Sequence, residues 1–146
     1  MELLEIEVGS IFHKQALDLR YHLFFEEMNH PRDILFDGKE KNSFHLALVK
    51  KSELVAYGRL SQHSLSEYQI SQMVVNPRYQ GLGYGKQVLN GLVNKAKVLK
   101  SETIFLNARL TAVSLYQSVG FIFDGEAHES PATKVEHIRM KLSLLN

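Results

Sequence analysis

Apolar residues recur along the N-terminal part of the chain with two different periods. Residues 3–8 alternate apolar and acidic positions, which is typical of a strand with one buried face. Ser10 is a suitable N-cap for a helix that ends before Pro31. Its apolar positions at helical spacing are Ile11, Phe12, Ala16, Leu19, Leu23 and Phe24. The pattern therefore predicts a strand followed by an amphipathic helix.

Three strand-like runs follow a polar loop at residues 33–41. Residues 44–49 and 54–60 are separated only by a short polar turn, which favours a hairpin. Residues 70–75 form a third apolar run that leads directly into a glycine-rich stretch.

The C-terminal half repeats the change between helical and strand-like spacing. After the glycines, a helix is predicted from the apolar positions Val88, Leu89, Leu92, Val93, Ala96 and Leu99. The pattern predicts a strand at residues 103–106. Thr111 is a suitable N-cap for a short helix, and Gly120 lies just past its end. Two more strands are predicted at residues 121–123 and 135–144. This order indicates a mixed α+β fold, with a central sheet covered by helices.

The overall composition narrows the class of protein. A length of 146 residues is typical of one domain, residues 1–146, and the formal net charge of +1 argues against binding nucleic acid through bulk charge. The absence of cysteine excludes disulfides and thiol nucleophiles. The acidic N-terminus does not resemble a signal peptide, and no apolar run is long enough to span a bilayer. We therefore expect a cytoplasmic protein that binds neither nucleic acid nor membranes.

Residues 75–88, VNPRYQGLGYGKQV, place a glycine-rich turn between a strand and a helix. Backbone N–H groups at such a helix N-terminus bind phosphate, and glycine allows the backbone to come close to the ligand. The dinucleotide fingerprint that starts at Gly81 fails because position 86 is lysine, and a P-loop fails because Gln80 and Gln87 occupy two required positions. The turn therefore remains a candidate site for a polyphosphate ligand, which its backbone N–H groups would bind without either of these two motifs.

The spacing of Gln80, Gly83 and Gly85 resembles the Q/R-x-x-G-x-G/A motif of the GNAT superfamily of acetyl-CoA-dependent N-acyltransferases. A second segment, TAVSLYQSVGF at residues 111–121, is similar to the superfamily's A-x-x-L/F-Y-x-x-x-G-F motif. The order of the predicted elements also agrees with the superfamily. The resemblance implies a GNAT-like α+β fold, whose central sheet is mixed, mostly antiparallel and six- to seven-stranded.

Within this superfamily, the chain looks most like the small single-domain bacterial ElaA-like branch. LRYHLFFEEM at residues 19–28, NARLTAVSLYQSVGF at 107–121 and VEHIRM at 135–140 are similar to segments of that branch. The chain departs from the branch at Gln72, Arg109 and Ala132, where arginine, glutamine and an acidic residue are usual.

The resemblance implies an enzyme of the EC 2.3.1 class that moves an acetyl group directly from acetyl-CoA to a primary amine of a small molecule or peptide. The coenzyme's diphosphate would bind the backbone from Gly81 to Lys86, and its pantetheine arm would pair with the edge of residues 72–75. A backbone N–H of the latter segment would also stabilise the thioester oxyanion. The implied coenzyme residues are Met73, Val74, Val75, Gln80, Gly81, Leu82, Gly83, Tyr84, Gly85, Lys86, Arg109 and Tyr116.

Tyr116 is also the implied general acid, which returns a proton to the leaving thiolate. The general base is left open. Gln69 aligns with a glutamate that some members use, and it cannot accept a proton. Glu67, His63, His137 and a relaying water remain candidates, of which histidine titrates nearest neutrality.

No motif such as H-E-x-x-H is present, so we expect no metal. A non-catalytic acyl-CoA-binding module with the same fold is the alternative, because Gln69, Arg109 and Ala132 depart from catalytic relatives. An unrelated α+β scaffold would need two motifs to agree by coincidence. The sequence identifies neither the acceptor amine nor the oligomeric state, although a homodimer is the commonest assembly.

Overall fold

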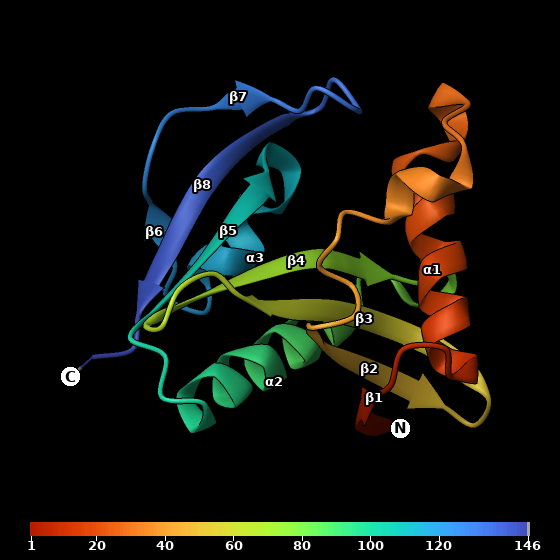
Figure 1. The fold of residues 1–146 in the computed structure, drawn as a ribbon, viewed down its shortest axis with the longest axis horizontal. Helices are drawn as coiled ribbons and strands as arrows, with labels where there is room; N and C mark the ends of the chain where they lie inside the picture. The colour runs from red at the N-terminus through yellow and green to blue at the C-terminus, as the bar shows by residue number, and fades with distance from the viewer. Residues whose placement is uncertain (146) are drawn as a thin grey trace.

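An eight-stranded sheet runs through the computed structural model, which describes residues 1–145 (Figure 1). The first four strands form an antiparallel meander, and the remainder extend the sheet from its far side. The strands are β1 (Glu2–Ile6), β2 (Phe44–Lys50), β3 (Glu53–Gln62), β4 (Glu67–Val75), β5 (Thr103–Arg109), β6 (Ile122–Phe123), β7 (His128–Glu129) and β8 (Glu136–Ser143).

The strand order is β1-β2-β3-β4-β5-β8-β6, with β7 paired to β8. Within residues 1–145 only the β4–β5 pair is parallel, so the expectation of a mixed, mostly antiparallel sheet is confirmed. The sheet has eight strands rather than the expected six or seven. The additional strand, β7, contains only His128 and Glu129, which is too short to produce an alternating pattern in the sequence.

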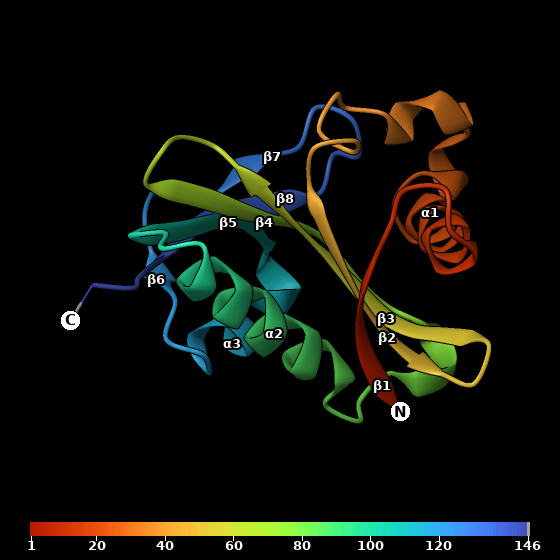
Figure 2. The same cartoon turned by 60° about the horizontal axis from the view of Figure 1, so that its bottom comes forward.

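Three α-helices accompany the sheet: α1 (Ile11–Phe24), α2 (Tyr84–Val98) and α3 (Val113–Gln117). Ser10 caps α1 as expected, and its side chain accepts a hydrogen bond from the backbone N–H of His13. The N-cap of α3 is Ala112 rather than Thr111, because residues 110–112 first form a 3₁₀ turn. Figures 1 and 2 show α1 and α2 on opposite faces of the β2–β4 part of the sheet.

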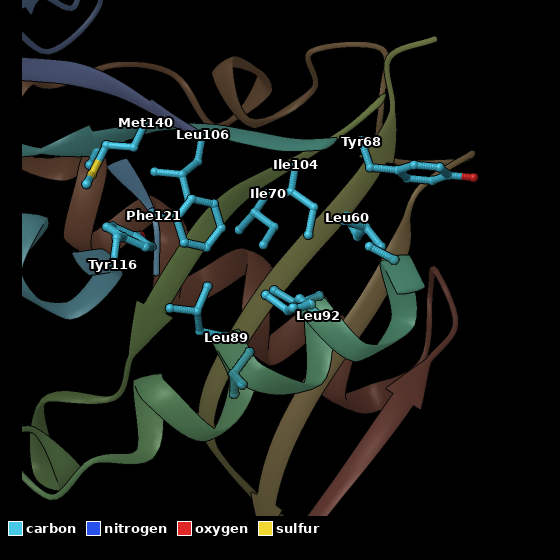
Figure 3. Packing of buried hydrophobic residues seen from close by; sticks show 14 of the residues in the cluster. Leu60, Tyr68, Ile70, Leu89, Leu92, Ile104, Leu106, Tyr116, Phe121 and Met140 are labelled. Atoms are coloured by element: carbon cyan, nitrogen blue, oxygen red, sulfur yellow. The ribbon is translucent and has the colours of Figure 1, made fainter. Parts of the chain in front are cut away.

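The larger hydrophobic core lies between α2 and the sheet. The predicted inward positions of α2, from Val88 to Ala96, are buried there. Leu89 and Leu92 pack beneath Ile70, Ile104 and Leu106 of the strands, and Phe121 and Tyr116 close one end (Figure 3). A smaller cluster, which includes Ala16, Tyr57 and Val74, lies under α1 on the opposite face. The two helices therefore hold β3 and β4 from both sides.

The parallel strands β4 and β5 separate soon after they begin (Figure 1). Their pairing covers only residues 67–69 and 103–105, so among the described strands none adjoins one edge of the rest of β4. The register of β3 against β4 shifts opposite Gly58, and Gln72 has a positive φ of 60°. This bulge bends β4 beside the gap between β4 and β5. None of the helices among the described residues is both long enough and apolar enough to cross a membrane.

Candidate active site

A cavity of about 970 Å³ occupies the space where β4 and β5 part. Its walls come from segments that are far apart in the sequence: residues 69–75 of β4, the glycine turn, the end of β5, α3, and residues 128–133 with His137. Leu23, Phe24 and Phe25, at the C-terminal end of α1, close the remaining side. The two faces of the sheet are therefore connected through this opening.

The glycine turn forms one end of the cavity. Gly81 and Gly83 have φ values of 77° and 86°, and Gly83 is the N-cap of α2. A β-carbon at either glycine would meet no protein atom within 4 Å, so the space above the turn is open to a ligand. The first turn of α2 has no acidic residue, and its N–H groups point away from the helix. This is the geometry of an anion site.

Most of the residues expected to contact the coenzyme line this one cavity. The set consists of Met73, Val74, Val75, Gln80, Gly81, Gly83, Tyr84, Gly85, Arg109 and Tyr116. Leu82 and Lys86 are exposed and do not line it, although the backbone of both belongs to the turn. Arg78, which precedes the turn and does not line the cavity, forms an ion pair with Glu53 at 2.7 Å.

Tyr116 lies on α3, where Phe121 packs edge-to-face against its ring at a centroid distance of 6.0 Å. The residue is 7% exposed and lines the cavity. Burial raises the pKa of the Tyr116 phenol to about 12, against a smaller lowering effect of Arg109. The phenol therefore keeps its proton at neutral pH and can donate it inside the cavity.

The three candidate bases lie in different places. His137 lines the cavity, whereas Glu67 and His63 do not. The carboxylate of Glu67 lies 3.8 Å from Arg139 and 3.9 Å from His63, and the ring of His63 packs on Phe105. Both are therefore held at the beginning of β4, away from the open part of the strand.

The imidazole of His137 is held in one orientation. Its Nδ1 donates to the carbonyl oxygen of Val135 at 2.9 Å, which leaves Nε2 as the acceptor of the neutral ring. Burial lowers the pKa of His137, and the positive charge of Arg109 and the nearby His128 act in the same direction against the bond to Val135. A neutral ring with an available lone pair is the form that accepts a proton.

Arg109 lies at the end of β5, directly opposite His137 of β8 in the strand register. Its guanidinium carbon is 4.9 Å from the centroid of the Phe24 ring on α1. Since α1 lies on the face of the sheet opposite α2, this contact places the Arg109 side chain away from the glycine turn. Phe24 and Phe25 both form part of the cavity wall on this side.

Sequence reasoning missed several parts of the site. A β-carbon at Gly58 would lie 2.5 Å from Sδ of Met73, so this glycine lets the bulge of β4 approach β3 and α2. The position of Gly58 inside a predicted strand was the signal that could have indicated a bulge or a close approach here. The cavity residues Asn107, Ser130 and Thr133 carried no signal, because their common location depends on how the strands fold together.

A second polar cluster is buried beneath α1. His13, Glu40 and His45 offer ligand atoms within 4.8 Å of one another, so tertiary structure creates a candidate cation site that motif spacing did not reveal. The hydrogen bonds instead indicate an ionic network centred on Glu40. Gly9 donates to Nδ1 of His13, so the neutral ring carries its proton on Nε2 and donates it to Glu40 at 2.7 Å. Arg20 and Arg59 also donate to this carboxylate, each at 2.8 Å.

Comparisons with known proteins agree with this geometry. The family described as "Acetyltransferase (GNAT) domain" matches residues 22–144. The crystal structure of Escherichia coli ElaA is similar with a TM-score of 0.81 and 27% identity, over 97% of this chain and 99% of that one. A GNAT family acetyltransferase from Elizabethkingia anophelis with acetyl-CoA bound has the same fold, with a TM-score of 0.76 and 17% identity, over 98% of this chain and 97% of that one.

Among curated relatives, an uncharacterised N-acetyltransferase of Pyropia yezoensis, ycf52, is 33% identical over 89 residues. The match covers 58% of this chain and 51% of the relative. The chain thus spans about half the length of the curated relatives that head this comparison. The resemblance found in the two sequence motifs and the ElaA-like segments is confirmed.

Proposed function

The chain belongs to the acetyltransferase (GNAT) domain family, and we propose that it moves an acetyl group from acetyl-CoA directly to a primary amine of a small molecule or peptide. One observation carries this proposal. The glycine turn, the unpaired edge of β4 and the Tyr116 side chain line a single cavity that opens to both faces of the sheet. The proposal assigns the activity to one domain formed by residues 1–146.

The backbone supplies most of the proposed coenzyme contacts. The diphosphate would lie on the N–H groups of the turn from Gly81 to Lys86, supported by the positive end of the α2 dipole. The amide-rich pantetheine arm would pair with the free edge of residues 72–75, as an added strand does. A backbone N–H near the bulge, between Met73 and Val75, would then donate to the thioester oxygen.

The transfer itself needs one new bond and one broken bond. The amine nitrogen attacks the thioester carbonyl carbon, the C–N bond forms, and the C–S bond breaks as the tetrahedral intermediate collapses. Tyr116 donates its proton to the departing thiolate, which gives CoA with a free thiol. The high pKa of Tyr116 keeps that proton available, and the phenolate recovers a proton from solvent.

The amine must lose a proton before or during attack. We assign this proton to Nε2 of His137, because His137 is the candidate base that lines the cavity and its Nδ1 is already engaged by Val135. Glu67 is held by Arg139 and His63 instead. No step in this scheme uses a metal.

The decisive experiment follows the appearance of CoA thiol from acetyl-CoA with a panel of amines, alongside calorimetry of CoA binding. The proposal expects amine-dependent thiol release together with stoichiometric N-acetyl product. Binding of acetyl-CoA without thiol release for any amine would instead support a non-catalytic acyl-CoA-binding module. Ligand at about 100 times its dissociation constant should stabilise the fold by roughly 2.7 kcal/mol, which gives an independent measure of binding.

A further inference from the structure

Arg109 is a cation that has no anionic partner within residues 1–145. The other two strand arginines on this face of the sheet are both paired: Arg59 with Asp37 and Glu40, and Arg139 with Asp124 and Glu67. Arg109 instead contacts the Phe24 ring and lines the cavity. Its charge is therefore available to a ligand that enters from the α1 side.

No aspartate or glutamate lines the cavity, counted over the described part of the chain. Acidic residues of the neighbouring segments are paired or directed elsewhere. Asp37, in the loop before β2, pairs with Arg59 at 2.7 Å. Glu129 and Glu136 alternate with the cavity residues His128 and His137 along β7 and β8, so they point to the opposite face. Glu26, just beyond α1, is exposed and pairs with His22.

One further cation, Lys39, lies beside this end, with the Asp37 carboxylate accepting a hydrogen bond from its backbone N–H. Lys39 donates to the side-chain oxygen of Gln69 at 3.0 Å, and Gln69 lines the cavity. A cavity with this set of charges repels a polycationic amine, because a second ammonium group would find no carboxylate there.

We propose that the acceptor is an amine that carries its own carboxylate, as a free amino acid does, and that Arg109 binds this carboxylate. The inference rests on the acetyl transfer proposed above and adds the substrate class. A guanidinium matches a carboxylate with two parallel N–H···O bonds. Asn107, Ser130 and Thr133 line the same cavity and provide neutral donors around it.

The remaining wall of the acceptor end is apolar. Leu23, Phe24 and Phe25 line it, and the rings of Phe24 and Phe25 lie edge-to-face at a centroid distance of 6.0 Å. This wall favours an amino acid with an apolar side chain. The α-amino nitrogen attacks the thioester carbonyl, its proton passes to His137, and the thiolate receives the Tyr116 proton, so the products are an N-acetyl amino acid and CoA.

The test compares each amino acid with its amide, for example L-leucine with L-leucinamide and L-phenylalanine with L-phenylalaninamide. The members of a pair have nearly the same shape. The amide has the less basic amine, so a larger fraction of it is unprotonated at neutral pH, and chemical reactivity alone therefore favours the amide. We expect kcat/KM for the acid to exceed that for the amide by roughly 10- to 100-fold, the effect of one charge-assisted interaction. This ratio needs no variant.

Arg109→Gln then removes the charge and leaves a shorter side chain that is still polar. We expect kcat/KM for the acids to fall by roughly 10- to 100-fold, the acid-to-amide ratio to fall towards one, and the KM for acetyl-CoA to stay unchanged. Arg109→Lys should restore part of the ratio, because lysine keeps the charge but loses the second bond. Arg139→Gln is the matched control: it makes the same change on the same face outside the cavity, and the ratio should be preserved.

Two results overturn the inference while the proposed function stands. One is thiol release with polyamines or neutral amines but not with amino acids, and the other is an acid-to-amide ratio that Arg109→Gln leaves unchanged. Absence of thiol release with every amine, despite measurable acetyl-CoA binding, overturns the proposed function, and this inference is lost with it. Selective release with the acids, reduced by Arg109→Gln, supports both.

Discussion

Nε2 of His13 lies 2.7 Å from Oε2 of Glu40, a residue 27 positions further along the chain. The same carboxylate accepts hydrogen bonds from Arg20 and Arg59, so three side chains from α1 and β3 converge on one acid in the loop between α1 and β2. The loop therefore depends on a buried ionic network that also fixes the position of α1 against the sheet.

Glu40→Gln is expected to destabilise the fold by about 3–5 kcal/mol, because it leaves the buried guanidinium groups of Arg20 and Arg59 without their shared anion. Chemical denaturation monitored by circular dichroism measures this change. Asp18→Asn is the control: it removes the acid of an exposed ion pair with Arg32 and should cost at most about 1 kcal/mol. Equal effects of the two variants would show that the network contributes little.

The same network makes stability depend on acidity. Burial by itself would raise the pKa of Glu40, but hydrogen bonds from Arg20 and His13, with further support from Arg59, lower it from 4.5 to about 2. The stability supplied by ionised Glu40 is therefore complete above pH 4.5 and is lost as the pH falls towards 2, in total roughly 3 kcal/mol. The difference in stability between the wild type and Glu40→Gln should shrink across this range. A difference that stays constant from pH 6 to pH 3 would contradict the lowered pKa.

Gly83→Ala is expected to weaken acetyl-CoA binding by at least about tenfold. The alanine β-carbon would stand in the open space where the phosphates are proposed to lie, and its φ of 86° adds roughly 1–2 kcal/mol of backbone strain. Gly9→Ala is the matched control, since Gly9 has a φ of 87° and equally open surroundings far from the cavity. Calorimetry should show that both variants lose similar stability but that only Gly83→Ala loses affinity.

Tyr116→Phe is expected to lower kcat by up to roughly 10²–10⁴-fold with little change in acetyl-CoA affinity, because only the donated proton is lost. Tyr68→Phe provides a comparison, since Tyr68 is also buried in the core but its hydroxyl points away from Tyr116 (Figure 3). With a pKa of about 12, Tyr116 should support turnover without an alkaline decline below about pH 11. Wild-type turnover by Tyr116→Phe would remove the acid role.

The pH–rate profiles of three variants identify the base. Burial lowers the pKa of His137, so the acidic limb of the wild-type profile should lie below the usual histidine value of 6.5. His137→Gln should reduce kcat by roughly 10²–10⁴-fold and abolish that limb. Glu67→Gln and His63→Gln should leave it in place, because neither residue lines the cavity. Unchanged profiles in all three variants would leave water as the proton acceptor.

Local patterns in the sequence were sufficient to predict most of the helices and strands. The spacing of apolar residues predicted α1 and α2 closely, and Ser10 and the glycine turn marked where they begin. Two short motifs, at residues 80–85 and 111–121, were sufficient for the family. β7 was missed because a two-residue strand exists only through its pairing with β8.

The sequence by itself determined the helices, the longer strands and the glycine turn, because hydrogen bonds and burial within a short segment specify these features. Only the tertiary structure decided that Glu40 joins two histidines and two arginines, that Gly58 lies against a bulge, and that His137 rather than Glu67 faces the cavity. It also placed the guanidinium of Arg109 over the ring of Phe24 of α1. These relationships depend on where two strands separate and on which face of the sheet a side chain projects from. Neither can be deduced from the separation of two residues along the sequence.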